Sequence, residues 1–311
     1  MKTLITGGLG FIGSAMVRRL LSDPRQEKII LVDKRTYAGK IENIQECLSD
    51  RRLSLEIIDI ADRDGLSRIL ESEHIDRILN FAAETHVDRS IADPYPFIHT
   101  NLDGLNNLLS LSRKYGVNTF VQISTDEVYG PRDLNGGKPA REGDPLNPTS
   151  PYAASKAGGD LLALSYFKTY GLDVRITRSS NCFGPHQYPE KLIPLTIKKI
   201  LQGLPVPIYG TGKNLRDWLH VEDDCTGILL VAEKGEKGGI YNISAHCEKT
   251  ALEVVQTIGR VMGRPPLLDF VQDRKGHDTR YLIDTDKIEK LGFKPQYNFD
   301  KDIRDVVKSY L

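Results

Sequence analysis

The stretch Gly7-Gly8-Leu9-Gly10-Phe11-Ile12-Gly13 lies between a short apolar run at residues 3–6 and a helical pattern that begins at Ser14. A strand that turns through spaced glycines into a helix is the opening unit of a dinucleotide-binding fold. The glycines permit the tight turn and let the backbone approach a pyrophosphate, which then lies at the helix N-terminus. A glycine motif alone also fits a plain strand-to-helix turn, so its meaning depends on the next elements of the chain.

The end of the second predicted strand indicates which dinucleotide, NAD or NADP, the chain binds. Residues 29–32 are apolar and end at Asp33, twenty residues after the last glycine of the motif. A carboxylate at that place hydrogen-bonds the ribose hydroxyls of NAD and repels the 2′-phosphate of NADP. We therefore expect NAD. Lys34 and Arg35 come directly after it, and basic side chains at this place would instead hold the phosphate of NADP.

Strand, loop and helix then alternate along the chain. The stretches 55–58, 77–81 and 174–177, each with apolar residues, predict strands, and the pattern over 97–115 predicts a long helix. Such alternation is typical of a doubly wound parallel sheet, so the predicted fold class is α/β with a Rossmann sheet. After these strands the elements become shorter and richer in proline, and we expect a smaller C-terminal substrate-binding region there.

One predicted strand ends in a hydroxyl and two carboxyl groups. The apolar run 120–123 reads as a buried strand, and Thr125, Asp126 and Glu127 stand where it opens into a loop. In open α/β sheets that end of a strand faces the ligand crevice. The alternative is that the two carboxylates are a solvated pair in an exposed loop.

A tyrosine and a lysine further on are spaced for one helix face. Tyr152 and Lys156 are four residues apart, which places both on the same side of a helix, about one turn apart. A positive charge beside a phenol favours its ionised form, and a tyrosine that loses its proton near neutral pH is a plausible general base. Such pairs are also common on helix surfaces, so this one gains meaning only with the dinucleotide motif.

The composition of the 311 residues argues against several classes of protein. Apolar residues make up 40% and charged residues 27%, as in globular proteins. Lys+Arg and Asp+Glu both number 42, so no net field attracts nucleic acid or an anionic membrane. No apolar run approaches the ~20 residues that span a bilayer, and with no signal-peptide pattern the cytoplasm is the expected location. The four cysteines form no C-x-x-C pair, and the histidine spacing predicts no metal site.

The glycine motif, the Thr125-Asp126-Glu127 block and the Tyr152/Lys156 pair occur together in this chain. In this combination the chain resembles the extended short-chain dehydrogenase/reductase family, and within it the dTDP-glucose 4,6-dehydratases. The resemblance runs from Thr3 to the last helix. It implies an NAD-binding Rossmann domain at 1–180, interleaved with a nucleotide-sugar-binding region at 181–311. It also implies a homodimer that pairs the two long helices of each chain.

The activity that the resemblance implies is the loss of water from a nucleoside-diphosphate hexose, with dTDP-glucose favoured, to give a 4-keto-6-deoxy sugar. Tyr152 would take the proton of the C4 hydroxyl, while Lys156 keeps the phenolate charged and Thr125 donates to the C4 oxygen. Glu127 would then remove the C5 proton as Asp126 protonates the leaving C6 hydroxyl. NAD would accept hydride from C4 and return it to C6, so it acts as a bound catalyst.

The resemblance also assigns binding residues. Asp59 and Ile60 would lie along the adenine, although Asp59 or Asp62 also fits a helix cap. The residues expected at the cofactor are Gly7, Gly10, Phe11, Ile12, Gly13, Asp33, Lys34, Thr36, Asp59, Ile60, Phe81, Ala82, Ala83, Thr100, Tyr152, Lys156 and Cys182. The residues expected at the substrate are Thr85, Thr125, Asn181, Lys191, Leu192, Pro207, Tyr209, Arg216, Arg274 and His277.

Several positions depart from the dehydratase pattern. Cys182 stands where Asn is frequent, Lys275 where Pro is usual, and Ala251 where we expect an Asn that touches the nucleotide. Thr85 replaces a Ser and keeps the hydroxyl. None of these removes a reacting group, but they leave a UDP-sugar open as the substrate. The rival functions are an epimerase on the same fold and a catalytically silent dinucleotide-binding protein.

Overall fold

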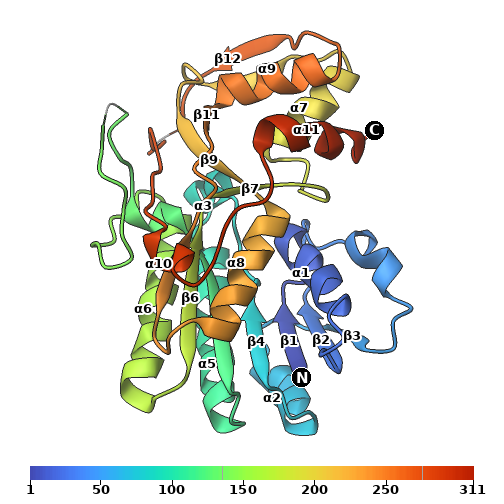
Figure 1. Cartoon of the computed structure of the whole chain (residues 1–311), viewed down its shortest axis with the longest axis vertical. Coiled ribbons are helices and arrows are strands. Elements are labelled where there is room, and N and C mark those ends of the chain that lie inside the picture. The colour runs from blue at the N-terminus through green and yellow to red at the C-terminus, as the bar shows by residue number, and fades with distance from the viewer. Residues whose placement is uncertain (135, 275) are drawn as a thin grey trace.

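Seven parallel strands form the central sheet, in the lower half of Figure 1. The structure, a computed structural model, describes residues 1–134, 136–274 and 276–311. The strands lie in the order β10-β6-β5-β4-β1-β2-β3, and the order reverses between β1 and β4. The prediction of a doubly wound parallel sheet is therefore confirmed. The bounds are β1 Lys2–Thr6, β2 Lys28–Asp33, β3 Leu53–Ile57, β4 Arg77–Asn80, β5 Thr119–Thr125, β6 Val174–Ser179 and β10 Ile240–Ile243.

Helices cover both faces of this sheet. On one face α1 and α8 pack over a core that includes Val121 and Ile243. On the other face α2, α5 and α6 pack over a core that includes Phe120 and Ile176. Because both faces are buried, β2 is mostly apolar, and in β6 even the polar residues are buried. The bounds are α1 Phe11–Leu21, α2 Arg63–Ser72, α5 Leu105–Lys114, α6 Pro151–Tyr170 and α8 Val221–Lys234.

The long helix predicted at 97–115 is present, with a wider turn in its middle. It consists of α4 (Tyr95–Ile98), a π-helical segment η2 (His99–Gly104) and then α5. Within η2, the Asn101 side-chain amide donates to Ser155 Oγ on α6 at 2.8 Å and to the Glu84 carbonyl at 3.1 Å. Single π turns inside helices are frequent at functional sites, and this one lies next to the helix that carries Tyr152 and Lys156.

A smaller lobe stands above the carboxyl ends of the sheet strands (Figure 1). It has its own core, in which Trp218, Val254 and Phe299 are buried. Its elements are strands β7 Asn181–Phe183, β8 Val206–Tyr209, β9 Leu215–His220, β11 Glu248–Thr250 and β12 Leu268–Val271, with helices α7 Leu192–Leu201, α9 Ala251–Val261 and α11 Phe299–Lys308.

The chain crosses between the two lobes several times. It enters the small lobe after β6, returns through α8 and β10 to the central sheet, and then leaves again for β11 and α9. The short helix α10 (Asp286–Glu289) returns once more, because Ile288 packs in the core under α1 and α8. The region expected at 181–311 therefore contains an edge strand and a covering helix of the nucleotide-binding sheet.

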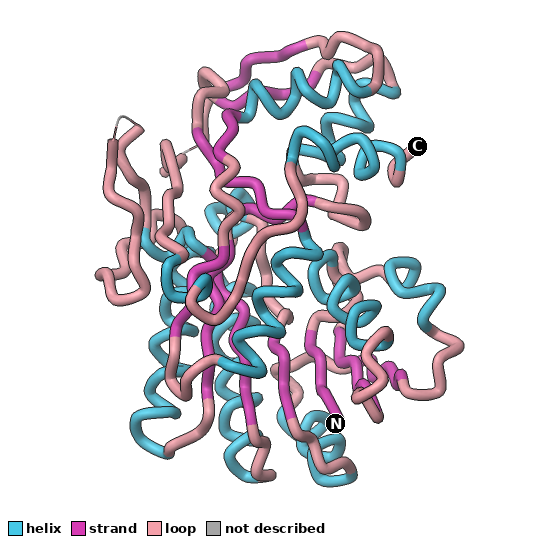
Figure 2. Tube along the Cα trace, viewed as in Figure 1, coloured by secondary structure: helices cyan, strands magenta, loops and turns pink. Residues whose placement is uncertain are grey.

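A long segment joins η3 (Asp126–Tyr129) to α6. Figure 2 draws its described residues, 130–134 and 136–150, as loop beside the upper end of α6. An isolated bridge joins Ala140 in this loop to Ile283, which ties it to the C-terminal part of the chain. Lys275, one of the departures from the dehydratase pattern, lies outside the described residues.

No helix among the described residues is long and apolar enough to cross a membrane. Nor do those residues contain a group of three or more His, Cys, Asp or Glu side chains that could hold a metal ion. The expectation that the reaction needs no metal stays a prediction. All four cysteines are free thiols, as the absence of paired spacing indicated.

Candidate active site

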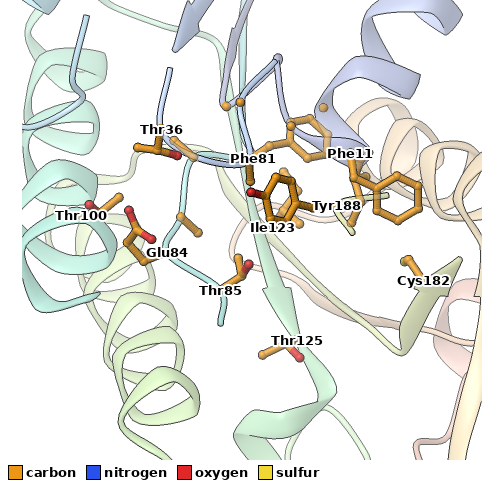
Figure 3. A pocket seen from close by; sticks show the side chains of 18 of the residues that line it. Phe11, Thr36, Phe81, Glu84, Thr85, Thr100, Ile123, Thr125, Cys182 and Tyr188 are labelled. Carbon is orange, nitrogen blue, oxygen red and sulfur yellow. The ribbon is translucent and has the colours of Figure 1, made fainter. Parts of the chain in front are cut away.

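A cavity of about 300 Å³ lies at the carboxyl ends of the central strands, between the sheet and the small lobe. In the view of Figure 3, Thr36, Thr100 and Glu84 lie on one side of it and Cys182 on the other. The cavity is lined by every residue that was expected at the cofactor, from Gly7 to Cys182, and by all five residues that were expected to react. The dinucleotide motif and the catalytic block thus belong to one site.

The glycine turn packs so closely against its own and the neighbouring backbone that it has no space for side chains. Gly7 has φ of 68°, and a Cβ there would lie 2.6 Å from the Ala82 nitrogen. A Cβ on Gly13 would lie 2.3 Å from the Gly7 carbonyl oxygen. Gly10 caps α1 without any side-chain hydrogen bond, so the free N–H groups of the first helical turn are available to an anion. These features fit the pyrophosphate of a dinucleotide.

Asp33 is fixed at the end of β2 by two backbone donors. Leu9 N–H donates to Oδ2 at 3.0 Å and Arg35 N–H donates to Oδ1 at 2.8 Å. Burial raises the pKa of this carboxyl, and the two hydrogen bonds act against that shift. The carboxylate therefore stands at the cavity edge in the place that a ribose diol requires.

Lys34 turns into the cavity and is occupied by neighbouring groups. Its Nζ donates to Thr100 Oγ1 at 3.0 Å and lies 3.4 Å from Asp59 Oδ2 and 3.8 Å from Glu84 Oε1. Arg35 is exposed and does not line the cavity. The arrangement disfavours the alternative in which these two cations hold a 2′-phosphate.

The three residues Thr125, Asp126 and Glu127 stand at the junction of β5 and the 3₁₀ turn η3. The Thr125 hydroxyl caps this turn by accepting from Glu127 N–H at 3.3 Å, and it also lies 3.3 Å from Asp126 Oδ1. The prediction that the block lies where the strand opens is confirmed. The alternative of a solvated loop pair is wrong, because Asp126 is only 3% exposed and both carboxylates line the cavity.

Asp126 is in an environment that favours its protonated form. Burial raises its pKa well above the usual value, and the charge of Glu127 adds to the shift. Its Oδ2 is buried and has no hydrogen-bond partner among the described residues. A buried carboxyl without a paired cation holds its proton near neutral pH, which is the state that a general acid needs.

Glu127 has a different set of neighbours. Burial raises its pKa, but Arg216 and Lys191, and to a smaller extent Arg274, lower it. The Tyr281 hydroxyl also donates to Glu127 Oε2 at a long 3.5 Å. Burial and Asp278 still leave the pKa of Glu127 above its usual value. Three cations oppose that shift at Glu127 and only Arg216 does so at Asp126, so the ionised state is less disfavoured at Glu127 than at Asp126.

Tyr152 and Lys156 lie on the first turns of α6 and line the cavity. Lys156 Nζ donates to the Ile123 carbonyl at 2.5 Å, and burial lowers its pKa to about 8. Burial and then Glu127 raise the pKa of the Tyr152 phenol, whereas a hydrogen bond from Thr125 acts in the opposite direction. In the protein alone, burial thus outweighs the effect expected from the lysine, so the spacing of Tyr152 and Lys156 does not by itself lower the pKa of the phenol.

The predicted substrate residues fall into two groups. Thr85, Thr125, Asn181 and Lys191 line the cavity, whereas the remaining ones lie on the small lobe outside it. In the second group Arg274 lies 4.4 Å over the Tyr209 ring, and His277 contacts the same ring edge-on at 6.4 Å between centroids. Those outside the cavity are Leu192, Pro207, Tyr209, Arg216, Arg274 and His277.

Basic side chains occur in both groups of predicted substrate residues, those that line the cavity and those on the small lobe. Lys191 precedes α7 without a side-chain cap on that helix, and its Nζ donates to the Thr85 carbonyl at 3.4 Å. Lys191, Arg216 and Arg274 all lower the pKa of Glu127, so the charges of all three act on the same carboxylate. Arginine and lysine with an open helix N-terminus form a suitable seat for a diphosphate.

The resemblance points to the segment 188–195 as facing the nucleotide, but it does not assign the individual residues of a cluster at the rim of the cavity. The Arg89 guanidinium lies 3.6 Å over the Tyr37 ring and 3.3 Å from Glu190 Oε2, and Tyr188 contacts Tyr37 edge-on at 5.2 Å. Tyr188 and Glu190 line the cavity and come from an irregular loop before α7, which no periodic pattern marks. The cluster joins this loop to α3 (Val87–Ala92) and to the loop after β2.

A second missed group could have been found. Ser179 and Ser180 stand at the end of β6, at the same edge of the sheet as Thr125, so the rule of strand ends applies to them as well. Ser179 Oγ donates to Asp224 Oδ1 at 2.5 Å, and Cys182 Sγ lies 3.4 Å from Asp224 Oδ2. Burial raises the pKa of Asp224 to about 6. Cys182 thus keeps the place expected of it and contacts a carboxyl.

The sheet order, the glycine turn and the Tyr152/Lys156 pair define an extended short-chain dehydrogenase/reductase. Residues 4–306 match the family described as GDP-mannose 4,6 dehydratase. The chain belongs to this family of nucleotide-sugar dehydratases.

Individual relatives are similar over their full length. A dTDP-glucose 4,6-dehydratase of Actinoplanes sp. is 46% identical, over 100% of this chain and 98% of its own. The crystal structure of DesIV, a dTDP-glucose 4,6-dehydratase from Streptomyces venezuelae with NAD bound, is 46% identical with a TM-score of 0.96, over 100% of this chain and 97% of that one. The UDP-glucose 4-epimerase of Thermus thermophilus in complex with NAD is 30% identical with a TM-score of 0.92, over 100% and 99%. Dehydratases and epimerases share this fold, so the site residues must decide between them.

Proposed function

We propose that the protein is an NAD-dependent dehydratase that converts dTDP-glucose to dTDP-4-keto-6-deoxyglucose. The observation that carries the proposal is the pair Asp126 and Glu127, which line the same cavity as Tyr152 and Lys156 and differ in electrostatic environment. An epimerase needs only the oxidation pair. A dehydratase also needs an acid and a base for the elimination, and this site has a candidate for each.

The residues around the cavity fit NAD. Its pyrophosphate would lie on the glycine turn, where Gly7 and Gly13 leave no room for side chains, and its adenosine ribose would meet Asp33. When bound, NAD supplies an acceptor that takes hydride from C4 of the sugar and returns it to C6. The same DesIV structure that shares the fold is described with NAD bound.

Oxidation at C4 is assigned to three residues. Thr125 and Tyr152 both line the cavity, and Thr125 lowers the pKa of the Tyr152 phenol against the effect of burial. Tyr152 takes the proton of the C4 hydroxyl, and Thr125 holds the C4 oxygen in place. Lys156, with a pKa of about 8, is mostly protonated at neutral pH and stabilises the phenolate.

Elimination is assigned to the two carboxyl groups. The C4 ketone acidifies the C5 hydrogen, which Glu127 removes as an ionised base supported by Arg216 and Lys191. Asp126, held in its acid form by burial, gives its proton to the C6 hydroxyl, which leaves as water. Once C6 has accepted hydride, Glu127 returns its proton to C5. The proton that Tyr152 took from the C4 hydroxyl then balances the one that Asp126 gave, so the net change in the sugar is the loss of one water.

The proposal is tested by offering the protein, as purified and without added NAD, dTDP-glucose and UDP-glucose in separate reactions. We expect dTDP-glucose to lose the mass of one water and UDP-glucose to remain unchanged. Loss of water from UDP-glucose alone would overturn the assignment of the nucleotide. A change of sugar configuration without a change in mass would mean that the protein is an epimerase, and no reaction with either compound would contradict a dehydratase.

We expect the protein to bind NAD more tightly than NADP by at least about tenfold, or ~1.4 kcal/mol. The reason is that Asp33 faces the ribose, whereas Lys34 is already held by Thr100 and Asp59. Titration followed by intrinsic fluorescence or calorimetry measures both affinities. Replacing Asp33 by asparagine is the matched test, since it should narrow the preference, and equal affinities in the parent protein would show that the basic residues govern the site.

A homodimer in the cytoplasm is the expected state of the enzyme. The outer faces of α4 and α6 support this, because Tyr95, Ile98 and Leu161 are exposed there, with Leu161 61% exposed. Sedimentation should give twice the mass of the chain, and Leu161→Glu should shift the protein to a monomer. Leu267→Glu is the control, since Leu267 is 58% exposed on the small lobe and should leave the dimer intact. A monomeric parent protein would contradict the proposal.

A further inference from the structure

A buried carboxylate lies one helical turn beyond the catalytic lysine. Asp160 comes four residues after Lys156 on α6, so both stand on the same face of the helix. Asp160 is fully buried, and its Oδ2 accepts from Arg178 Nε at 2.8 Å. Arg178 is itself 2% exposed and comes from the end of β6. This ion pair lies behind the cavity, and Asp160 and Arg178 do not line it.

The guanidinium of Arg178 also reaches the turn that carries the two catalytic carboxyl groups. Its second nitrogen donates to the Tyr129 hydroxyl at 2.7 Å, and the group lies 4.7 Å over the Tyr129 ring. Tyr129 is the last residue of η3, two positions after Glu127. Arg178 therefore connects α6, with the oxidation pair, to η3, with the elimination pair.

The contact continues to a third segment. The Tyr129 hydroxyl donates to Asn242 Oδ1 at 2.8 Å, and the Asn242 amide donates to the Ala140 and Asp284 carbonyls, both at 3.0 Å. Ala140 lies in the long loop after η3, and Asp284 belongs to the C-terminal segment that bridges to it. Through Asn242, the hydrogen bonds that begin at Asp160 and Arg178 thus extend to β10, the loop after η3 and the C-terminal segment.

A buried ion pair is weak evidence for stability, because desolvation of the charges offsets much of their attraction. An apolar pair of similar size would stabilise the folded protein as well. What an apolar pair would not supply is a charge near Lys156 and directed hydrogen bonds that fix η3 against α6. The position of this pair, between the two halves of the catalytic set, therefore points to a role in the reaction.

We propose that Asp160, Arg178 and Tyr129 form a brace that positions the Tyr152/Lys156 pair relative to the Asp126/Glu127 pair and keeps the Lys156 ammonium charged. None of the three touches substrate or cofactor, so they are positioning residues. The inference rests on the proposed function where it concerns turnover. Its effect on the charge of Lys156 is independent of that function.

The electrostatic part of the brace is specific to Asp160. Burial lowers the pKa of Lys156, and among the described residues Asp160 is the one charge that raises it. The other ionisable groups on α6, η3 and β6 nearby, namely Tyr152, Asp126, Glu127 and Arg178, do not contribute to the shift. Burial raises the pKa of Asp160, and Arg178 and Lys156 both act against that shift, so each of the two cations favours the ionised carboxylate.

The first test is the titration of Lys156 itself. In protein labelled with ¹³C at lysine Cε, the signal of Lys156 is assigned by its loss in Lys156→Met and followed with pH. In Asp160→Asn, the Lys156 pKa should fall by about one unit, because a nearby opposite charge is removed. The alkaline limb of kcat should move to lower pH by the same amount, with little change in KM, since fewer molecules carry the protonated lysine.

The matched control is a second buried pair on the same strand. Arg175 binds Asp173 through Nε at 3.1 Å and a terminal nitrogen at 2.9 Å, at the end of β6 away from the cavity. Asp173→Asn should reduce thermal stability as Asp160→Asn does, but leave the Lys156 titration and the pH profile unchanged. If Asp160→Asn also leaves both unchanged, the pair is structural only and the proposal is wrong.

If Asp160→Asn does not fold, two further variants still test the proposal. Asp160→Asn with Arg178→Met removes both charges, so no buried cation is left unpaired, and the shift in the Lys156 titration should persist. Tyr129→Phe keeps the ion pair and the ring but removes the link to η3. It should lower kcat at least about tenfold without moving the Lys156 titration, and a parent-like kcat in Tyr129→Phe would overturn the positioning role of the brace.

The brace and the proposed function can fail separately. If the parent protein has no dehydratase activity but Asp160→Asn still shifts the pKa of Lys156, the proposed function is wrong and the brace is supported.

Discussion

Replacing Tyr152 by phenylalanine is expected to lower turnover by about 10²–10⁴-fold, the usual loss when a general base is removed. The variant loses one hydroxyl and keeps the ring, which contacts Phe97 edge-on at 6.4 Å between centroids. Folding and NAD binding should therefore remain nearly unchanged. Single-turnover measurements with dTDP-glucose should show no early formation of the reduced cofactor, because the C4 hydroxyl keeps its proton.

A tyrosine on the outer side of the same helix provides the control. Tyr166 donates its hydroxyl to Asn106 at 2.8 Å near the surface, so Tyr166→Phe also removes one hydroxyl and one hydrogen bond from α6. It should turn over at the parent rate. If Tyr152→Phe matches it, Tyr152 is not the base, and the oxidation must use another group in the cavity.

The second large effect is expected at the two carboxyl groups. Asp126→Asn removes the transferable proton and Glu127→Gln removes the base, and each should slow product formation by about 10²–10⁴-fold. Both variants keep Tyr152 and Lys156, so oxidation at C4 should still occur. Reduced cofactor should then accumulate on the protein in a single turnover, which its absorbance measures.

The two stalled variants should differ in exchange of the C5 hydrogen with deuterated water. Glu127→Gln should retain that hydrogen, because its base is missing. Asp126→Asn should still exchange it, because only the acid for the leaving group is missing. Mass spectrometry of the recovered sugar after reaction in deuterated water distinguishes the two results.

The matched control for both carboxylate variants is Asp144→Asn, which changes a half-buried carboxylate outside the cavity, in the loop after η3. It should dehydrate dTDP-glucose at the parent rate. If Asp126→Asn and Glu127→Gln also do so, the two carboxyl groups only hold the sugar, and an epimerase becomes the better assignment.

The fold and the inner site could be predicted because their signals are local. Spaced glycines, an acidic residue at the end of β2 and polar residues after β5 each reflect the geometry of a parallel sheet. The same geometry brings their side chains into one cavity without any knowledge of long-range contacts. Phe81, Ala82 and Ala83 were found for the same reason, since they come directly after β4.

The outer site and the titration behaviour could not be predicted in the same way. Tyr188 and Glu190 reach the cavity through contacts with Tyr37 and Arg89, which are far away in the sequence. The pKa of Tyr152 depends on how completely the phenol is buried, and spacing to Lys156 does not reveal that. Asp160 and Arg178 form their ion pair across two elements, and neither carries a motif of its own.

The repeated crossing between lobes limits how this enzyme can be re-engineered. A designer who grafts residues 181–311 from a relative with another sugar specificity would also exchange β10, an edge strand of the nucleotide-binding sheet, and α8, which covers one face of it. Ile243 and Cys225 would then be replaced by side chains that had not been selected to pack against this sheet. Specificity must instead be transplanted as separate pieces on either side of α8 and β10, so that the sheet keeps its native edge and cover.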